Sequence, residues 1–183
     1  MFLNLIIHNL IPHVSRSGAF VFALALCVAL SMLIHELGHF TAARLCHVPA
    51  SEIGLGLGPR LFWFRIRRMT FSLRLFPVAS FLRLDGSSLK ERPIAQQLFV
   101  HLGGVTFNLL VGLLTFGTVF GWINLLLAAA NILPVYQHDG WKCGVVLVRA
   151  CLGRTSAPVE WAFTFSGGFA SLALVWALIR LFV

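Results

Sequence analysis

The chain has 183 residues, of which 58% are apolar and only 11% are Asp, Glu, Lys or Arg. An ordinary soluble domain carries about 25% charged residues, so the composition excludes a disordered chain and argues against an ordinary soluble enzyme of this size. It is typical of an integral membrane protein. The length allows one domain, and we expect a single integral-membrane unit over residues 1–183.

Long stretches without charge predict the membrane spans. A helix needs about 20 apolar residues to cross a bilayer. With Glu36 as the one exception, Asp, Glu, Lys and Arg are missing from residues 17–43, 93–138 and 161–179. The first and last stretches fit one span each and the middle one fits two. The sequence therefore predicts an all-α polytopic membrane protein with about four transmembrane helices, near 18–41, 95–116, 118–133 and 159–181.

Basic residues predict the orientation of these spans. Eight Lys and Arg residues lie in 45–93 and three in 134–158. Because positive charge stays on the cytoplasmic side of a membrane, we expect both loops to be cytoplasmic, in a prokaryotic cell membrane. Topology and attraction to anionic lipid explain the net charge of +8. The bilayer is therefore the expected partner, and nucleic acid is not.

The first of these loops contains a predicted β segment at about 52–85. The apolar residues Phe62, Phe64 and Ile66 occupy every second position, and the same period of two continues beyond a turn near Arg68 and Met69. This alternation is typical of a β-hairpin. A third short strand is predicted over 80–84. These features indicate a small cytoplasmic, membrane-associated β-hairpin or sheet between the first and second helices.

The first predicted span carries an H-E-x-x-H motif, His35-Glu36-Leu37-Gly38-His39. Residues four apart share one face of a helix, so both imidazoles can bind one ion. Zn²⁺ suits such ligands and keeps an open position for water in catalytic sites. Glu36 is the candidate general base that would take a proton from that water. We therefore expect one zinc ion per chain.

A third protein ligand must come from another part of the chain. Asp139 is the candidate by position, because it directly follows the longest uncharged stretch, where Pro134 and Gly140 are expected to break a helix. His138 is the neighbouring alternative. Because adjacent residues in extended backbone point in opposite directions, we do not expect His138 and Asp139 to bind the same ion. A Glu from a later helix, as in another class of membrane metalloprotease, leaves Glu160 as a weaker candidate.

At this point the sequence resembles the site-2 protease family of intramembrane zinc metalloproteases. The family's first core span carries H-E-x-x-H, and a later span carries N-x-x-P-x-x-x-L-D-G, which Asn131, Pro134, Asp139 and Gly140 match. The resemblance implies that Asp139 is the third zinc ligand. Its A-G-P-x-x-N segment is similar to 103–108, which implies that Asn108 binds substrate backbone near the metal. Asn131, Gly104 and Pro134 are expected to support the site or the substrate.

The chain also departs from the family pattern in several places. The Leu of L-D-G is His138 and the following second glycine is Trp141, while the Pro of A-G-P is Val105 and a G-G pair is Ala79-Ser80. None of these changes removes a predicted ligand or the base. The short segment 117–121 has no room for the peptide-binding PDZ domain of many members, so we expect a compact member without PDZ or nucleotide-sensing domains.

The expected function is zinc-dependent hydrolysis of a peptide bond in or near the transmembrane segment of a membrane-protein substrate, as in regulated intramembrane proteolysis. The strands would hold an unwound substrate at their edge, and a membrane regulator is a candidate further partner. The alternative is a non-enzymatic metal-binding membrane protein, either a transporter or an inactive scaffold of the same fold. Glu36 discriminates between the two, because a structural or transport site has no need of a general base.

Overall fold

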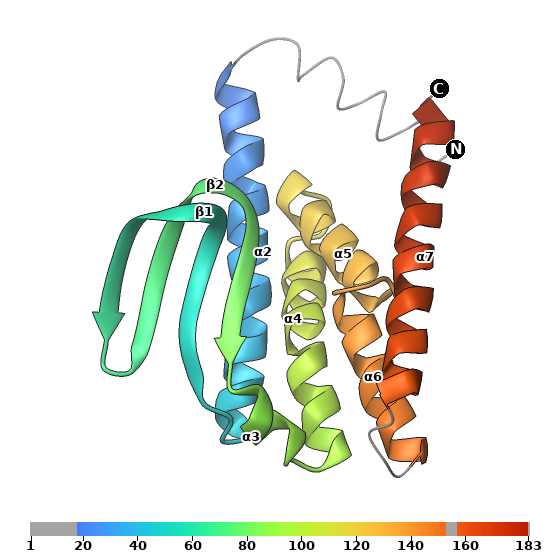
Figure 1. Ribbon diagram of the computed structural model, residues 1–183. Coiled ribbons are helices and arrows are strands. Elements are labelled where there is room, and N and C mark those ends of the chain that lie inside the picture. The colour runs from blue at the N-terminus through green and yellow to red at the C-terminus, as the bar shows by residue number, and fades with distance from the viewer. Residues whose placement is uncertain (1–17, 153–156, 183) are drawn as a thin grey trace.

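A computed structural model describes residues 18–152 and 157–182 of the chain. Its helices and strands follow in the order α2 (Gly18–Leu45), β1 (Ala50–Ile66), β2 (Met69–Leu84), α3 (Gly86–Lys90), α4 (Ile94–Leu114), α5 (Val119–Ile132), α6 (Asp139–Leu152) and α7 (Ala157–Phe182). The long helices run side by side, with the sheet against α2 at one edge and α7 at the other (Figure 1). The fold is thus mostly helical, as the composition predicts.

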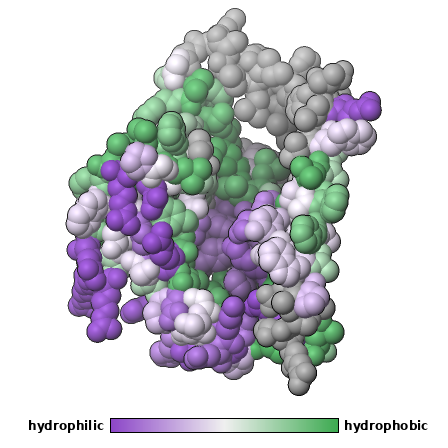
Figure 2. All heavy atoms as spheres, in the orientation of Figure 1, coloured by the Kyte–Doolittle hydropathy of each residue, from purple (hydrophilic) through white to green (hydrophobic). Residues whose placement is uncertain are grey.

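The helices α2 and α4 have the properties of membrane spans. Within the residues that the structure describes, these two are long and apolar enough to cross a bilayer. Large apolar side chains remain exposed along their shafts, among them Phe22, Leu26, Leu110 and Leu113. Green apolar residues accordingly cover much of the upper left in Figure 2, whereas purple polar residues lie in the hollow at the centre and on the outside at the lower left. An apolar exterior around a polar interior is what a lipid environment favours.

The region predicted as a third span and a following loop is a broken helix. The helix α5 has 14 residues and is about 21 Å long, which is short of the roughly 30 Å hydrocarbon core. After residues 133–138, α6 continues toward the opposite end of the molecule (Figure 1). The prediction of a loop over 134–158 is therefore wrong for 139–152. Pro134 lies in the break as expected, but Gly140 lies in the first turn of α6.

The link between α4 and α5 is short, and the two helices pack closely. Four residues separate Leu114 from Val119, so the link between the two helices is a short turn. Asn124 of α5 reaches α2, where its amide nitrogen donates a 2.9 Å hydrogen bond to Ser31 Oγ. Both side chains are fully buried. Polar contacts of this kind help to hold helices together where no water is available.

Two long bent strands form a sheet with four strand segments. Gly54 of β1 pairs with Phe81 on one side and with Ser72 on the other, while Phe64 pairs with Phe71. The spatial order is therefore 60–66, 69–76, 50–57 and 80–84. Both Gly56 (φ 103°) and Gly58 (φ 85°) adopt positive φ angles where β1 bends, a conformation that glycine accepts readily. The predicted third strand, 80–84, is the last part of β2.

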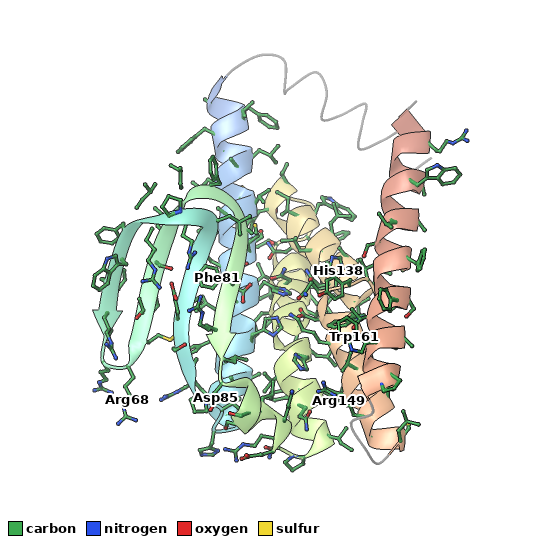
Figure 3. The ribbon with its side chains drawn as sticks, viewed as in Figure 1. Arg68, Phe81, Asp85, His138, Arg149 and Trp161 are labelled. Atoms are coloured by element: carbon green, nitrogen blue, oxygen red, sulfur yellow. The ribbon has the colours of Figure 1, made fainter. Side chains whose placement is uncertain are left out.

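The sheet lies alongside α2 rather than beyond its end (Figure 1). The sequence predicts these strands in a cytoplasmic, membrane-associated segment, and periodicity alone carries no information on their depth. The last segment of β2 is the part of the sheet next to α2, and the hairpin turn points to the same end of the molecule as Asp85 and Arg149 (Figure 3). One edge of the sheet is thus brought beside the helix that carries H-E-x-x-H.

A buried carboxylate ties the sheet together. Glu52, which is 4% exposed, accepts hydrogen bonds from Arg60 at 2.9 and 3.0 Å and from Ser72 Oγ at 2.8 Å. Arg74 and Arg83 lie 3.5 and 3.7 Å from its oxygens. Burial acts to raise the pKa of the Glu52 carboxyl, but these hydrogen bonds and charges together hold it below its ordinary value. The ionised carboxylate therefore has a full set of donors.

The helix α7 docks on the break between α5 and α6. Trp141 Nε1 donates to the Phe163 carbonyl at 3.3 Å, and its ring packs edge-on against Tyr136 with centroids 5.0 Å apart. A Cβ on Gly167 would lie 2.7 Å from the indole, so only glycine allows this approach. Trp141, one of the departures from the family pattern, is thus the side chain that anchors α7.

Candidate active site

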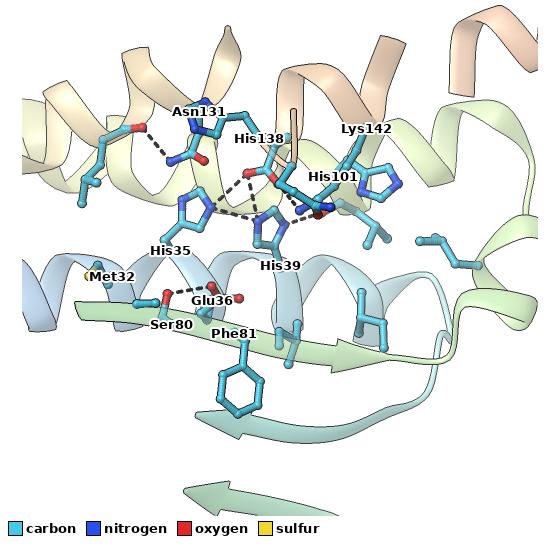
Figure 4. Close-up of a pocket in the computed structure, with 18 residues that line it drawn as sticks. Met32, His35, Glu36, His39, Ser80, Phe81, His101, Asn131, His138 and Lys142 are labelled. Carbon is cyan, nitrogen blue, oxygen red and sulfur yellow. Dashed lines mark hydrogen bonds and ion pairs between the residues drawn. The ribbon is translucent and has the colours of Figure 1, made fainter. Parts of the chain in front are cut away.

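Three side chains from two distant parts of the chain converge on one point. His35 and His39 of α2 lie next to each other (Figure 4), and both contact Asp139 at the start of α6. Asp139 Oδ2 lies 2.9 Å from His35 Nε2 and 3.1 Å from His39 Nε2, and the two Nε2 atoms are 3.1 Å apart. All three residues are buried, and Asp139 is 1% exposed. Within the described residues, this is the group whose ligand atoms lie close enough together to hold a metal ion.

The hydrogen bond of His39 to the backbone favours a tautomer that can bind a metal ion. His39 Nδ1 lies 2.7 Å from the Val100 carbonyl oxygen, which accepts a hydrogen bond from Nδ1–H. The neutral imidazole then has its lone pair at Nε2, so that lone pair faces a carboxylate oxygen and a second imidazole nitrogen. A cation between these atoms would be bound by all three electron-pair donors.

The geometry of the donors fits zinc. Tetrahedral Zn²⁺ has metal–nitrogen and metal–oxygen distances near 2.0–2.1 Å, which places neighbouring ligand atoms about 3.3 Å apart. The observed separations of 2.9–3.1 Å are close to that value. Two imidazoles and one carboxylate are also the donor set of several catalytic zinc sites.

The second oxygen of Asp139 has a different partner. Lys142 lies one turn further along α6, and its Nζ donates to Oδ1 at 3.0 Å. The carboxylate is therefore divided, with Oδ1 held by the ammonium group and Oδ2 directed at the imidazoles. Lys142 fixes the rotation of the carboxylate and leaves one oxygen to act as a ligand.

Glycines bring α4 against the two imidazoles. Gly38 of α2 faces Gly103 of α4, and a Cβ on Gly38 would lie 2.7 Å from the Gly103 carbonyl carbon. A Cβ on Gly104 would lie 2.6 Å from His39 Nε2 and 2.7 Å from His35 Nε2. Backbone contact between α2 and α4 is thus part of the site, and Gly104 supports it by leaving room for the ligand atoms.

A cavity of about 710 Å³ opens beside these residues. It is lined by both histidines, Asp139, Glu36, Lys142 and the last segment of β2 from Ala79 to Leu82, among others. Glu36, which is 8% exposed, accepts a 2.7 Å hydrogen bond from Ser80 Oγ. The cavity therefore brings together the candidate metal ligands, the edge of the sheet and the carboxylate of Glu36, which is the right type of group for a general base.

The remaining predicted residues are placed unevenly. Asn131 lines the cavity, and its amide donates to the Leu127 carbonyl at 3.0 Å. Pro134 is exposed in the break between α5 and α6 and does not line the cavity. Asn108 is fully buried in α4 and does not line it either, so its predicted contact with substrate stays a prediction.

The alternatives for the third ligand fare differently. His138 lines the cavity, but its Nδ1 is engaged 2.8 Å from the Ala130 carbonyl, and the group that could hold a metal does not include it. The side chain of Glu160 lies outside the part that the structure describes. Asp139 is therefore the third donor that the described geometry brings to the histidines.

Sequence reasoning missed four polar residues of this cavity, Ser80, His101, Gln137 and Lys142. For Lys142 a signal existed, because residues three apart share a helix face, but 139–152 was expected to be a loop. No local pattern signals the contact of Ser80 with Glu36, which are 44 residues apart.

Comparison with known proteins identifies relatives of the chain. A model of a protein family described as Peptidase family M50 matches residues 22–120. The protein named Putative zinc metalloprotease FN1322 from Fusobacterium nucleatum is 30% identical over 92 residues, which cover 46% of this chain and 27% of that protein. A protein of Thermotoga maritima, named Putative zinc metalloprotease, is 33% identical over 98 residues, 46% of this chain and 20% of its own length. The matched parts thus span less than a third of these relatives.

A solved structure shares the fold. The Site-2 Protease from Methanocaldococcus jannaschii aligns with a TM-score of 0.52 over 99% of this chain and 76% of that chain, at 21% sequence identity. At this identity the likeness concerns the fold alone. It extends beyond the segment matched by the family model and includes α6 and α7.

Proposed function

The chain belongs to peptidase family M50, and from this premise we propose that it is a zinc-dependent intramembrane endopeptidase. We propose further that residues 1–183 act as one domain. The substrate of this endopeptidase is a membrane protein, which is cut in or near a transmembrane segment. The observation that carries the proposal is the convergence of His35, His39 and Asp139 with Glu36 in one cavity among apolar helices.

Each residue has a role that follows from its position. His35, His39 and Asp139 would hold the metal, and Lys142 would keep the carboxylate oriented. When bound, zinc supplies a Lewis acid that activates water and polarises a carbonyl group. Glu36 takes the proton of the attacking water and delivers it to the leaving amide nitrogen. Buried surroundings strengthen these charge interactions.

The sheet offers a way to hold the substrate. Residues 80–84 pair with β1 on one side, and this segment lines the cavity and lies next to α2. A substrate helix must unwind before its peptide bonds can be cut, and the unwound stretch needs hydrogen-bond partners in a dry environment. An added strand along 80–84 would supply them and would lay the peptide beside Glu36.

We also propose the arrangement in the membrane. The chain crosses four times, through α2, α4, the pair α5–α6 and α7. The end that carries the hairpin turn, with Arg68 and Arg149 (Figure 3), faces the cytoplasm of a prokaryotic cell, because basic residues concentrate there. The break between α5 and α6 lines the cavity, as irregular backbone at membrane depth requires.

The competing function is a non-enzymatic metal-binding membrane protein. The experiment that separates the two compares purified wild type with Glu36→Gln, measuring bound zinc and the cleavage of single-span fusion proteins. We expect both proteins to bind one zinc ion per chain and only the wild type to cleave. Equal cleavage by both would rule out the proposed mechanism. Zinc binding without cleavage by the wild type would favour the transporter or scaffold.

A further inference from the structure

We propose that Ser80 is a positioning residue that holds the general base Glu36 from the substrate-binding strand. This inference rests on the proposed function. It adds a contact between the two halves of the site, the sheet and the H-E-x-x-H helix. Ser80 stands where the family pattern that the sequence resembles has a glycine, which would offer no side chain there.

The geometry of the contact is direct. Ser80 Oγ donates to Glu36 Oε1 at 2.7 Å, and Figure 4 shows the two side chains pointing toward each other from β2 and α2. Glu36 is 8% exposed. A carboxylate buried this far needs a hydrogen-bond donor, and in the described part of the chain the hydroxyl of Ser80 is the donor to this group.

The flexible side chain of Glu36 explains why a fixed donor matters. A glutamate has three rotatable bonds, and a general base must stay within hydrogen-bond reach of the water that it deprotonates. With Oε1 hydrogen-bonded to Ser80, Oε2 has no protein donor among the described residues and can accept that proton. The hydroxyl thus selects one rotamer of the base without taking part in the proton transfer.

The position of Ser80 in the chain couples the base to the substrate. Ser80 begins the strand segment 80–84, whose backbone pairs with β1 through Leu55 and Gly54 and whose residues line the cavity. A peptide added to this segment would fix the backbone that carries the hydroxyl. Substrate docking and placement of Glu36 would therefore be mechanically linked.

The same sheet provides a matched control. Ser72 Oγ donates to Glu52 Oε1 at 2.8 Å, so it makes a serine–glutamate hydrogen bond of the same kind, but neither residue lines the cavity. Removal of this hydroxyl weakens the sheet and leaves Glu36 untouched. The comparison separates loss of positioning from loss of strand structure.

The test measures cleavage of fluorescein-labelled casein and of single-span fusion proteins by purified wild type, Ser80→Ala, Ser80→Thr and Ser72→Ala in detergent. We expect Ser80→Ala to lower kcat about tenfold with little change in KM or in zinc affinity. Ser80→Thr keeps the hydroxyl and should recover most of kcat. Ser72→Ala should lower thermal stability while retaining kcat.

Two outcomes would overturn the inference. One is a Ser80→Ala enzyme with wild-type kcat, and the other is a kcat loss that Ser72→Ala reproduces. Glu36→Gln keeps this test distinct from that of the proposed function. If Glu36→Gln is inactive while Ser80→Ala is fully active, the base stands and the role of Ser80 fails. If Glu36→Gln cleaves as well as the wild type, the mechanism itself fails.

Discussion

Two buried carboxylates in this molecule have opposite surroundings. Glu52 in the sheet is met by a hydroxyl and three guanidinium groups, all of which donate hydrogen bonds or carry positive charge. Asp139 has one cationic partner, Lys142, on Oδ1, while Oδ2 faces two imidazole nitrogens. The first carboxylate is satisfied by the protein. The second lies among the donor atoms that could hold a metal ion.

This difference separates a carboxylate that stabilises the fold from one that can bind a metal ion. Both groups are almost fully buried, so burial does not distinguish them. The partners do, because arginines compensate the charge of Glu52 permanently, whereas Oδ2 of Asp139 lies beside two imidazole nitrogens that can share a metal ion with it. Substitution of each carboxylate by its amide therefore tests the comparison directly.

The largest effect is expected for Asp139→Asn. An amide removes the anionic ligand while it keeps the shape of the side chain, so zinc affinity should fall by at least about 100-fold and cleavage should be lost. Competition with a chelator measures the affinity, and metal analysis gives the stoichiometry. An Asp139→Asn protein that purifies with one tightly bound zinc would show that the carboxylate is not a ligand.

Gly104→Ala should have the next largest effect. The added methyl group would lie 2.6–2.7 Å from the Nε2 atoms of both histidines, so either an imidazole or α4 has to move. We expect zinc affinity to fall about 10- to 100-fold while the helices remain folded, as circular dichroism would show. Gly168→Ala is a suitable control, because a Cβ there meets no atom within 4 Å. Wild-type affinity in Gly104→Ala would mean that this close approach is unimportant.

The candidate site was largely predictable because charged residues are scarce in this sequence. Only six acidic residues occur in 183, so the H-E-x-x-H motif and one later Asp stood out without structural knowledge. The break in the third helix was equally visible, since Pro134 cannot continue a helix. Short-range rules of this kind depend on the local residues alone.

The parts that could not be predicted depend on long-range geometry. Alternation indicated strands, but not that β1 and β2 each bend and that the first part of β1 pairs on both edges, as Gly54 does. The position of the strands along the membrane normal could not be predicted either, because an amphipathic strand has the same sequence pattern beside a membrane helix as beyond its end. The contact of Ser80 with Glu36 follows from this placement and has no local signal.

A smaller effect is expected for Lys142→Met, which removes the charge that holds Asp139 Oδ1. The carboxylate is then free to rotate, and zinc affinity should fall about tenfold, whereas Lys142→Arg should stay close to the wild type. Arg149→Met, on the same helix but outside the cavity lining, serves as the control. If Lys142→Met binds zinc as tightly as the wild type, its contact with Asp139 does not orient the ligand.

Glu52→Gln is the counterpart of the first substitution and should leave zinc binding unchanged. The amide accepts a weaker hydrogen bond from Ser72 and gives three arginines no charge partner, so the sheet should lose about 2 kcal/mol of stability. The exposed Arg83, at 62%, contributes little of this. Thermal unfolding in detergent measures the loss, and metal analysis checks the zinc. Zinc loss in Glu52→Gln would remove the distinction between the two carboxylates.

The smallest effect is expected in the pH dependence of stability. Because the pKa of Glu52 lies below its ordinary value of 4.5 in the folded protein, the unfolded chain binds a proton more readily. The stabilisation is therefore present above pH 4.5 and is lost as the pH falls through the folded pKa. Glu52→Gln lacks this titration, so the difference in unfolding temperature between wild type and variant should shrink between pH 6 and pH 3. The other carboxyl groups titrate in both proteins and cancel in the difference. Parallel stability curves across this range would mean that Glu52 is not preferentially ionised by its arginines.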